Sequence, residues 1–266
     1  MYTLPKSRLL AFLMKVALLI TTYNSPDVLN LVIASVADQT RLPDEVIICD
    51  DGSDQSTASI ISYWLNRLPI RHTWSPDINF RAASTRNLGI LKSRAEVLIF
   101  VDGDCLLPPT FVEQHLELSQ PGYLITGGRH LLTSEKTRSI LKAELTLSSI
   151  FNNWKFLNSP FGILRDLGPK NWESVRTCNL SVYRQDVVRI AGFDESYVGW
   201  GREDSDFVVR LIRSGIKIRS GRLAACVAHM YHSERSRASL SSNDRRFRET
   251  LNNPNHVMAT SSVLSL

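Results

Sequence analysis

No stretch of the sequence has the roughly 20 consecutive apolar residues that a membrane-spanning helix requires. The apolar segment near the N-terminus is divided by Lys15 into Leu9–Met14 and Val16–Ile20. Basic residues precede it, as in a signal peptide, but no small-residue cleavage site follows. We therefore predict that residues 1–14 are an N-terminal extension with Met14 as an alternative start, and that deletion of residues 1–13 leaves activity intact.

Cysteine is scarce and widely spaced. The four cysteines, Cys49, Cys105, Cys178 and Cys226, form no pair at the short spacing of metal-binding motifs. Three of them lie within or beside apolar runs, where buried free thiols are common. This usage disfavours a disulfide framework and predicts a reducing, cytoplasmic compartment.

The chain carries only a small excess of positive charge. The formal net charge is +5, and the hydrophobic fraction of 43% and charged fraction of 21% are ordinary for a globular protein. Such a surplus suits anionic small molecules or an acidic membrane surface as well as nucleic acid. The partners that we predict do not include nucleic acid. No internal repeat or linker divides the 266 residues, which are enough to bury a large core.

Basic residues gather near the C-terminus. Residues 235–248 hold Arg235, Arg237, Arg245, Arg246 and Arg248 against one acid, Asp244. Two interpretations stay open. The segment contacts anionic phospholipid, which would place the protein at the inner face of a membrane, or it is a solvated helix face.

Strand and helix patterns alternate in the first part of the chain. Short apolar, β-branched runs predict strands, and helix start signals such as Ser25-Pro26 and Asp54 follow them. The predicted strands are residues 15–22, 45–49, 70–74 and 97–101, and the predicted helices are residues 26–36, 54–68 and 82–93. This alternation predicts an α/β fold with a parallel sheet, in which the polar residues after the strands meet at one edge.

The pattern is less regular beyond that point. Strands are predicted at residues 123–128, 177–183 and 223–228, and helices at residues 140–150, 185–191 and 207–214. Residues 152–171 are rich in aromatics, glycine and proline, which predicts a loop that could act as a lid. The chain after Ser233 shows no clear element.

Two acids follow the apolar run at residues 97–101. Asp102 and Asp104 are separated only by Gly103, which permits a tight turn. A cation between two carboxylates at a strand end would relieve their repulsion and lost hydration. A helix-capping turn before Phe111 is the alternative, and the spacing alone leaves both open.

A second acidic cluster, Glu203-Asp204-Ser205-Asp206, opens a predicted helix. Acids at a helix N-terminus are favoured by the helix dipole alone. Three acids in four residues exceed what capping needs, so we favour a functional role. Two histidines, His229 and His232, follow the predicted strand at residues 223–228, where a single histidine is more often structural.

Several ordered motifs give the chain a family resemblance from about Val16 to Arg248. They are Thr21-Thr22-Tyr23-Asn24, Asp50-Asp51-Gly52-Ser53, Arg81 with Arg86-Asn87-Leu88-Gly89-Ile90, Asp102-Gly103-Asp104, Asn179 before Gly192-Phe193-Asp194, and Gly199-Trp200-Gly201-Arg202-Glu203-Asp204. The set resembles inverting glycosyltransferases of family 2 with the GT-A fold. The last motif also resembles the β-1,4-galactosyltransferase and chondroitin-polymerase branches.

The resemblance implies an α/β GT-A fold. Its single Rossmann-like, mostly parallel sheet would be flanked by helices, with a nucleotide-sugar site at the C-terminal strand ends. It implies a domain at residues 15–248, with a nucleotide-binding part at 15–128 and an acceptor-binding part at 129–248. Residues 249–266 would then be a C-terminal tail.

The implied activity is metal-dependent, inverting transfer of a hexose or N-acetylhexosamine. The donor would be a UDP-sugar, the acceptor a hydroxyl of a glycan or lipid-linked glycan, and the metal Mn²⁺ or Mg²⁺. Bacterial surface polysaccharide or lipopolysaccharide synthesis is the expected setting.

The resemblance also assigns roles to residues. The nucleotide-sugar set is Thr21, Tyr23, Asp50, Asp51, Arg81, Arg86, Asp102 and Asn179. The metal set is Asp104 and Asp102, with His232 or His229 as a further ligand. Asp204 would be the catalytic base, Glu203 would orient donor or acceptor hydroxyls, and Trp200 would stack on an acceptor sugar.

Other classes fit less well. A sugar-1-phosphate nucleotidyltransferase would carry a Gly-rich, basic loop where Thr21-Thr22-Tyr23-Asn24 stands, and a Rossmann dehydrogenase would carry G-x-G-x-x-G. A catalytically silent nucleotide-sugar-binding module would not need the four acids Asp102, Asp104, Glu203 and Asp204. Donor hydrolysis with Mn²⁺ separates an enzyme from such a module.

Overall fold

The computed structural model describes residues 13–154, 171–233 and 236–265. Nearly all of the predicted N-terminal extension and most of the predicted lid loop lie outside these ranges. Within them, no helix combines the length and the apolar character that crossing a bilayer would need.

One eight-stranded sheet of the described residues forms the centre of the molecule, in the order β3-β2-β1-β4-β7-β6-β8-β5. The strands are β1 (Val16–Thr22), β2 (Glu45–Asp50), β3 (Ile70–Trp74), β4 (Val97–Asp102), β5 (Cys105–Leu106), β6 (Tyr123–Leu131), β7 (Asn179–Tyr183) and β8 (Lys217–His229). The predicted α/β class with a single sheet is confirmed. β1 to β4 are parallel, as predicted, but β7 runs antiparallel to both β4 and β6, so the second half of the sheet is mixed.

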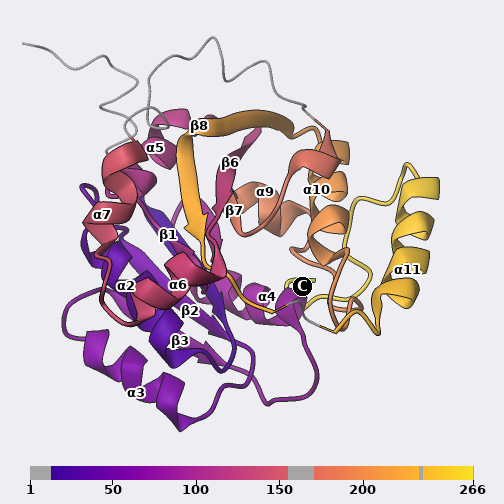
Figure 1. Ribbon diagram of the computed structural model, residues 1–266. Helices are drawn as coiled ribbons and strands as arrows, with labels where there is room; N and C mark the ends of the chain where they lie inside the picture. The colour runs from indigo at the N-terminus through magenta and orange to yellow at the C-terminus, as the bar shows by residue number, and fades with distance from the viewer. Residues whose placement is uncertain (1–12, 155–170, 234–235, 266) are drawn as a thin grey trace, which may run out of the picture.

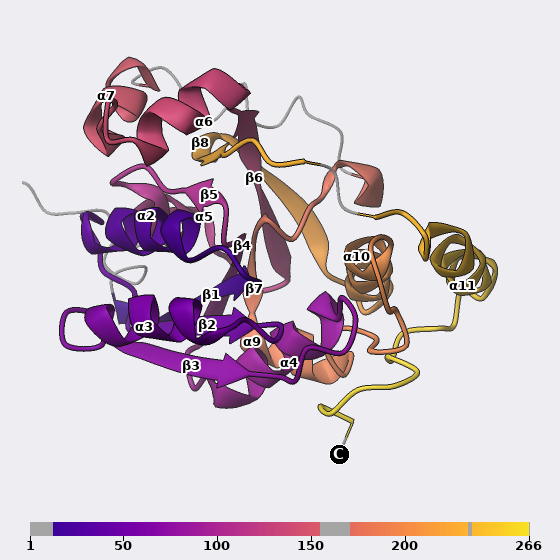
Figure 2. The same ribbon diagram turned by 60° about the horizontal axis from the view of Figure 1, so that its bottom comes forward.

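Helices cover both faces of this sheet. They are α2 (Pro26–Ala37), α3 (Gln55–Trp64), α4 (Ala82–Lys92), α5 (Phe111–Leu118), α6 (Ser134–Leu141), α7 (Leu147–Phe151), α9 (Arg184–Arg189), α10 (Glu203–Arg213) and α11 (Leu240–Asn252), with short 3-10 turns η1 (Asn152–Trp154) and η2 (Trp172–Ser174). Figures 1 and 2 show α2 and α4 on opposite sides of β1.

The two faces of β1 explain this arrangement. Val16, Leu18 and Ile20 pack with apolar residues of α2, α3 and α5. Ala17 and Leu19 point the other way and pack with α4, α9 and α10. Both sets are fully buried, so β1 reads as a continuous apolar run, as strands covered on two faces do.

The predicted helix at residues 140–150 is wrong. α6 ends at Leu141, Ala143 takes a left-handed φ of 57°, and α7 begins only at Leu147. Thr146 explains the restart, because its side chain accepts a hydrogen bond from the backbone N–H of Ser149 and caps α7.

The expectation of a C-terminal segment without structure is also corrected. α11 extends across the boundary predicted at residue 248. Beyond it, Ala259 N–H donates to the Ile190 carbonyl and Glu195 N–H donates to the Ser261 carbonyl. Leu264 joins the core beside α4 and α9, so this segment completes the domain.

All four cysteines are free and buried. This agrees with the expectation from their spacing, because buried thiols on separate elements behave as small apolar side chains.

Candidate active site

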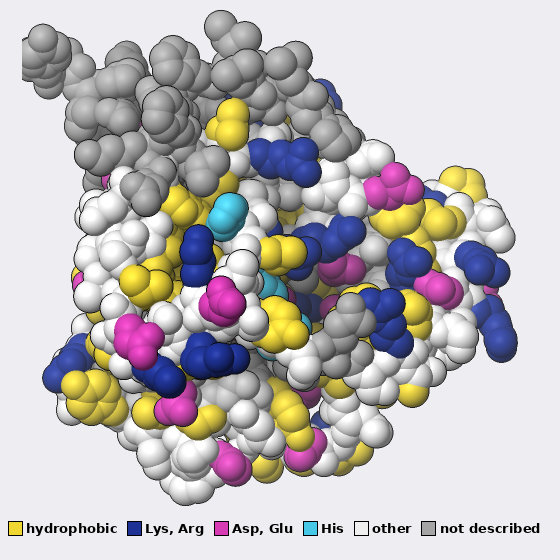
Figure 3. Space-filling view, in the orientation of Figure 1, with side chains coloured by type: hydrophobic (Ala, Val, Ile, Leu, Met, Phe, Trp, Pro, Cys, Tyr) yellow, Lys and Arg dark blue, Asp and Glu magenta, His cyan; other side chains and the backbone are white. Residues whose placement is uncertain are grey.

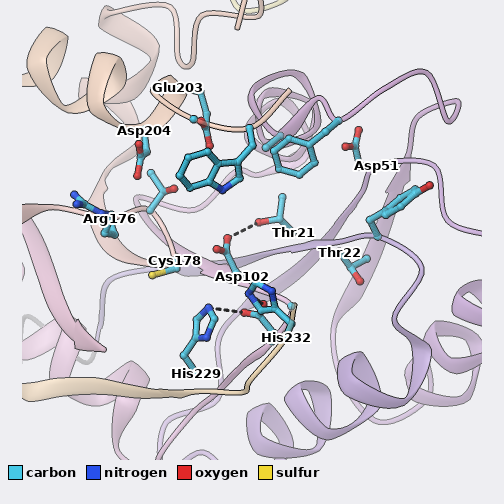
Figure 4. Close-up of a pocket in the computed structure, with 18 of the residues that line it drawn as sticks. Thr21, Thr22, Asp51, Asp102, Arg176, Cys178, Glu203, Asp204, His229 and His232 are labelled. Carbon is cyan, nitrogen blue, oxygen red and sulfur yellow. Dashed lines mark hydrogen bonds and ion pairs between the residues drawn. The ribbon is translucent and has the colours of Figure 1, made fainter. Parts of the chain in front are cut away.

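A pocket with a volume of about 670 Å³ opens at the carboxyl ends of β1, β2 and β4. The N-terminus of α10 and the end of β8 complete its wall, and Figure 4 shows side chains from these elements turned toward one another. On the face seen in Figure 3, basic side chains gather around a hollow that holds acidic and histidine side chains. The polar residues after the strands therefore meet at one edge of the sheet.

The turn at Gly103 fixes Asp102 against β1. Gly103 N–H donates to the Thr21 carbonyl at 2.7 Å, and a Cβ on Gly103 would lie 2.7 Å from that same oxygen. A larger residue would therefore push the two strand ends apart. The Thr21 hydroxyl donates to Asp102 Oδ1 at 3.1 Å, which places both predicted residues in the pocket wall.

Asp104 lies between the two histidines. Its Oδ1 is 3.4 Å from Nε2 of His229, and its Oδ2 is 3.4 Å from Nε2 of His232. Burial, together with the charge of Asp102, raises the pKa of the Asp104 carboxyl. A helix-capping role for this turn is not observed, because Thr110 is the residue that precedes α5.

The donor set around Asp104 fits a divalent cation. A partly buried carboxylate with a second acid nearby gains from a bound positive charge, and carboxylate oxygen and imidazole nitrogen are ligands that Mn²⁺ accepts. Asp104 and His229 also form a potential metal cluster with Cys105, whose Sγ lies 3.6 Å from Asp104 Oδ1. Burial raises the pKa of the Cys105 thiol well above its usual range, so it stays protonated and is a poor ligand for a hard cation. The sequence analysis did not single out Cys105.

Arg86 joins the two acidic motifs. Its Nη2 is 3.1 Å from Asp102 Oδ1, and its Nη1 is 3.3 Å from Glu203 Oε1. The Arg86 side chain is only 6% exposed, and its contact with Glu203 is the more sheltered of the two because Asp102 is partly exposed. An arginine is suited to this place because its planar fork can serve two carboxylates at once.

The acids of the second cluster lie in two places: two of them line the pocket and one is buried away from it. Glu203 and Asp204 line the pocket, and burial with repulsion from Asp204 raises the pKa of Glu203 to about 7. Asp206 is fully buried elsewhere, 2.7 Å from Arg210, and accepts a hydrogen bond from the Thr250 hydroxyl of α11. One of the three acids, Asp206, therefore has a structural role, because it holds α10 and α11 together.

The loop before α10 has an unusual backbone. Gly199, Gly201 and Arg202 have φ values of 78°, 106° and 76°, in the left-handed region that glycine adopts most easily. Arg202 is held there by an ion pair with Asp244 at 2.6 Å. This loop brings Trp200 to the pocket wall with 40% of the residue exposed.

The paired aspartates at the end of β2, Asp50 and Asp51, have different surroundings. Asp51 lines the pocket, while Asp50 is 1% exposed, accepts a hydrogen bond from Ser53 N–H and lies 2.9 Å from His72 Nε2. Tyr23 also lines the pocket, with its hydroxyl bonded to Asp77. Arg81 is not among the lining residues: its backbone N–H donates to Asp51, and its side chain donates to the Pro76 carbonyl.

Asn179 does not reach the pocket either. It is 1% exposed, and its amide donates to the carbonyls of Gly128 and Ala225 at 2.8 Å each. Its Oδ1 lies 2.9 Å from Nε2 of His115, whose pKa is lowered to about 4 by burial. Every polar atom of this amide is therefore engaged in tying β6, β7 and β8 together.

Several residues of the pocket wall were not among the predicted site residues. They are Thr22, Arg129, Arg176, Cys178, Tyr231 and Arg237. Thr22 was part of a motif, but single arginines in segments without a motif carry no local signal.

Comparison with known proteins agrees with the fold. The model of glycosyl transferase family 2 matches residues 17–190, and that of the N-terminal domain of galactosyltransferase matches residues 164–233. Two relatives are validoxylamine A glucosyltransferase of Streptomyces hygroscopicus subsp. limoneus, 28% identical over 77% of this chain and 49% of its own, and chondroitin synthase of Escherichia coli, 25% identical over 77% and 33%. The chain thus spans half or less of these relatives.

Solved structures share the architecture. Staphylococcus aureus TarS 1–349 in complex with UDP has a TM-score of 0.64 and 16% identity, and covers 91% of this chain with 67% of its own. The mannosyltransferase PcManGT from Pyrobaculum calidifontis, in complex with GDP-Man and Mn²⁺, has a TM-score of 0.60 and 14% identity, over 93% and 72%. The fold is that of the GT-A glycosyltransferases. The chain belongs to glycosyl transferase family 2.

Proposed function

We propose that this protein is a metal-dependent, inverting glycosyltransferase that uses a UDP-sugar. The observation that carries the proposal is one pocket lined by Asp51, Asp104 and Asp204, from three different parts of the chain. Such an enzyme needs one group to bind the nucleotide, one to hold the metal at the diphosphate, and a base for the acceptor. Asp51, Asp104 and Asp204 are assigned to these three tasks in that order. Hexose and N-acetylhexosamine donors are the proposed sugar class.

The nucleotide lies at the ends of β1 and β2. Asp51 accepts the imide N–H of uracil, and Tyr23 and Thr21 line the path of the ribose toward Asp102. The binding of UDP by TarS and of GDP-Man by PcManGT supports a nucleotide-sugar donor for this fold. Asp50, Arg81 and Asn179 are left out of this binding set because, unlike Asp51, they do not line the pocket.

The metal lies at Asp104, with His229 and His232 as nitrogen ligands and Asp102 beside them. When bound, Mn²⁺ or Mg²⁺ supplies Lewis-acid stabilisation of the charge that develops on the departing diphosphate. The Mn²⁺ in the PcManGT complex supports this choice. Ring nitrogens of His229 and His232 and carboxylate oxygens of Asp104 would supply the ligands of this site.

Asp204 is the base. The acceptor oxygen attacks the anomeric carbon while the bond from that carbon to the diphosphate oxygen breaks, and the hydroxyl proton passes to the Asp204 carboxylate. Attack opposite the leaving group inverts the configuration. Glu203, held by Arg86, orients sugar hydroxyls, and Trp200 offers a face for the acceptor ring.

The acceptor is a glycan or lipid-linked glycan in bacterial surface polysaccharide synthesis. The relatives of this chain in Streptomyces and Escherichia support a bacterial setting. Buried free cysteines support a cytoplasmic location. The basic segment at residues 235–248 is proposed to contact anionic membrane peripherally. Sedimentation with anionic liposomes at low salt tests this contact, and failure to bind would refute it.

A donor screen tests the function. UDP-sugars are incubated with the protein and Mn²⁺, and free UDP is measured. The anomeric configuration of the product tests inversion. Asp204→Asn should bind UDP with unchanged affinity but lose transfer, whereas Asp38→Asn, at the exposed C-cap of α2 and outside the pocket wall, is the control for charge. Normal transfer by Asp204→Asn would refute the base assignment, and pyrophosphate release from UTP would favour a nucleotidyltransferase.

A further inference from the structure

Two arginines reach the pocket from neighbouring strand ends. Arg129 lies on β6, directly after Gly128, whose carbonyl accepts a hydrogen bond from Asn179 on β7. Arg176 lies three residues before Asn179, in the segment that enters β7. Both side chains are exposed and line the pocket.

Neither arginine is matched by an acid in the ranges that the structure describes. Arg176 Nη1 donates only to the carbonyls of Glu173 and Val175, and Arg129 has no ion pair there. Two other pocket arginines differ, because Arg86 pairs with Asp102 and Glu203 and Arg202 pairs with Asp244. Two positive charges in the wall are thus left for a ligand.

The position of Arg176 favours the acceptor over the nucleotide, and Arg129 lines the same pocket. In Figure 4, Arg176 lies beside Asp204, and Asp51 lies on the opposite side of Asp102. A donor with its base at Asp51 and its diphosphate near Asp104 points its sugar toward Asp204. A divalent cation at Asp104 already matches the charge of the diphosphate, so the diphosphate does not need these arginines.

We propose that Arg129 and Arg176 bind an acidic group of the acceptor, so that the acceptor is an anionic glycan. The group is a uronate carboxylate or a phosphodiester, because a guanidinium fork holds either with two parallel hydrogen bonds. This inference rests on the proposed glycosyltransferase function. It adds that charge recognition sets the acceptor beside Asp204.

The test compares matched acceptors with one UDP-sugar that the protein turns over. The acceptors are an oligosaccharide ending in a hexuronate, the same compound after reduction of its carboxyl group, and a polyol-phosphate oligomer. Wild-type protein should use one acidic acceptor with a kcat/KM at least about tenfold above that of the neutral compound. Arg129→Gln and Arg176→Gln should each reduce this preference, mainly through KM, whereas Arg176→Lys should retain part of it.

Arg94→Gln is the control, since Arg94 is exposed at the opposite end of β4, and it should keep the full preference. The favoured acidic acceptor identifies the carboxylate or the phosphodiester as the source. Equal use of neutral and acidic acceptors by wild-type protein overturns the inference alone, as does an unchanged preference in both glutamine variants. A loss of preference for UDP-hexuronate over UDP-hexose in these variants would place the acid on the donor and also overturn it. No UDP release with any donor and acceptor would refute the proposed function itself.

Discussion

The guanidinium of Arg86 lies 3.3 Å from the carboxylate of Glu203, although 117 positions separate them in the chain. Its other amino group contacts Asp102. Donor and acceptor sides of the pocket are therefore joined by one buried side chain. A change at this residue should disturb both sides at once.

Arg86→Lys is expected to lower kcat by about 10²-fold, because a single ammonium cannot span two carboxylates and the loss of positioning is costly. Turnover of the donor found in the UDP-sugar screen measures the effect. Arg71→Lys is the control, since Arg71 forms a comparable but exposed pair with Glu45. Wild-type kcat in Arg86→Lys would show that the bridge does not position the reacting groups.

Mn²⁺ is expected to raise the melting temperature of the wild-type protein, because a ligand bound only by the folded state stabilises it. Asp104→Ala should abolish this shift. His229→Ala and His232→Ala should each reduce it, in proportion to the role of that ring as a ligand. Thermal unfolding with and without EDTA measures the shift, and His256→Asn is the control. A full Mn²⁺ shift in Asp104→Ala would move the metal to another site.

Asn179→Ala is expected to cost about 3 kcal/mol or more of unfolding free energy. It leaves the carbonyls of Gly128 and Ala225 and the ring of His115 without their partner, and each buried group left unpaired costs roughly 1–3 kcal/mol. Urea unfolding measures the loss, with the exposed Asn253→Ala as control. If Asn179→Ala is as stable as the wild type but binds UDP more weakly, the donor contact predicted for Asn179 from the sequence would be supported instead.

Local signals in the sequence predicted the first half of the fold. Apolar runs, caps and turn residues specify β1 to β4 and the helices between them, and parallel pairing follows from their alternation. Strand direction around β7 depends on contacts distant in sequence, so it was not predictable from periodicity. The same holds for Leu264, whose burial depends on a surface formed by α4 and α9.

The candidate site shows the same division. Asp102, Asp104, Glu203 and Asp204 stand in dense acidic motifs and all reach the pocket. Asn179 was predicted to contact the donor because it lies in an ordered motif, but the network around His115 occupies its amide. Arg129 and Arg176 carry no motif, and only their place in the pocket wall draws attention to them.

The stability of the metal-free protein should depend on pH through Glu203. Burial and Asp204 raise its pKa from the usual 4.5 to about 7 in the folded state. The folded state therefore holds the proton more tightly, so the stability that this group contributes is full below about pH 4.5 and is lost as the pH rises through 7. Glu203→Gln cannot ionise, so its unfolding free energy relative to wild type should rise by on the order of 3 kcal/mol between pH 4.5 and pH 8. Urea unfolding in EDTA across this range measures the difference, with Glu144→Gln, at an exposed position, as control. A relative stability that falls with rising pH would mean that Arg86, rather than burial, controls the ionisation of Glu203.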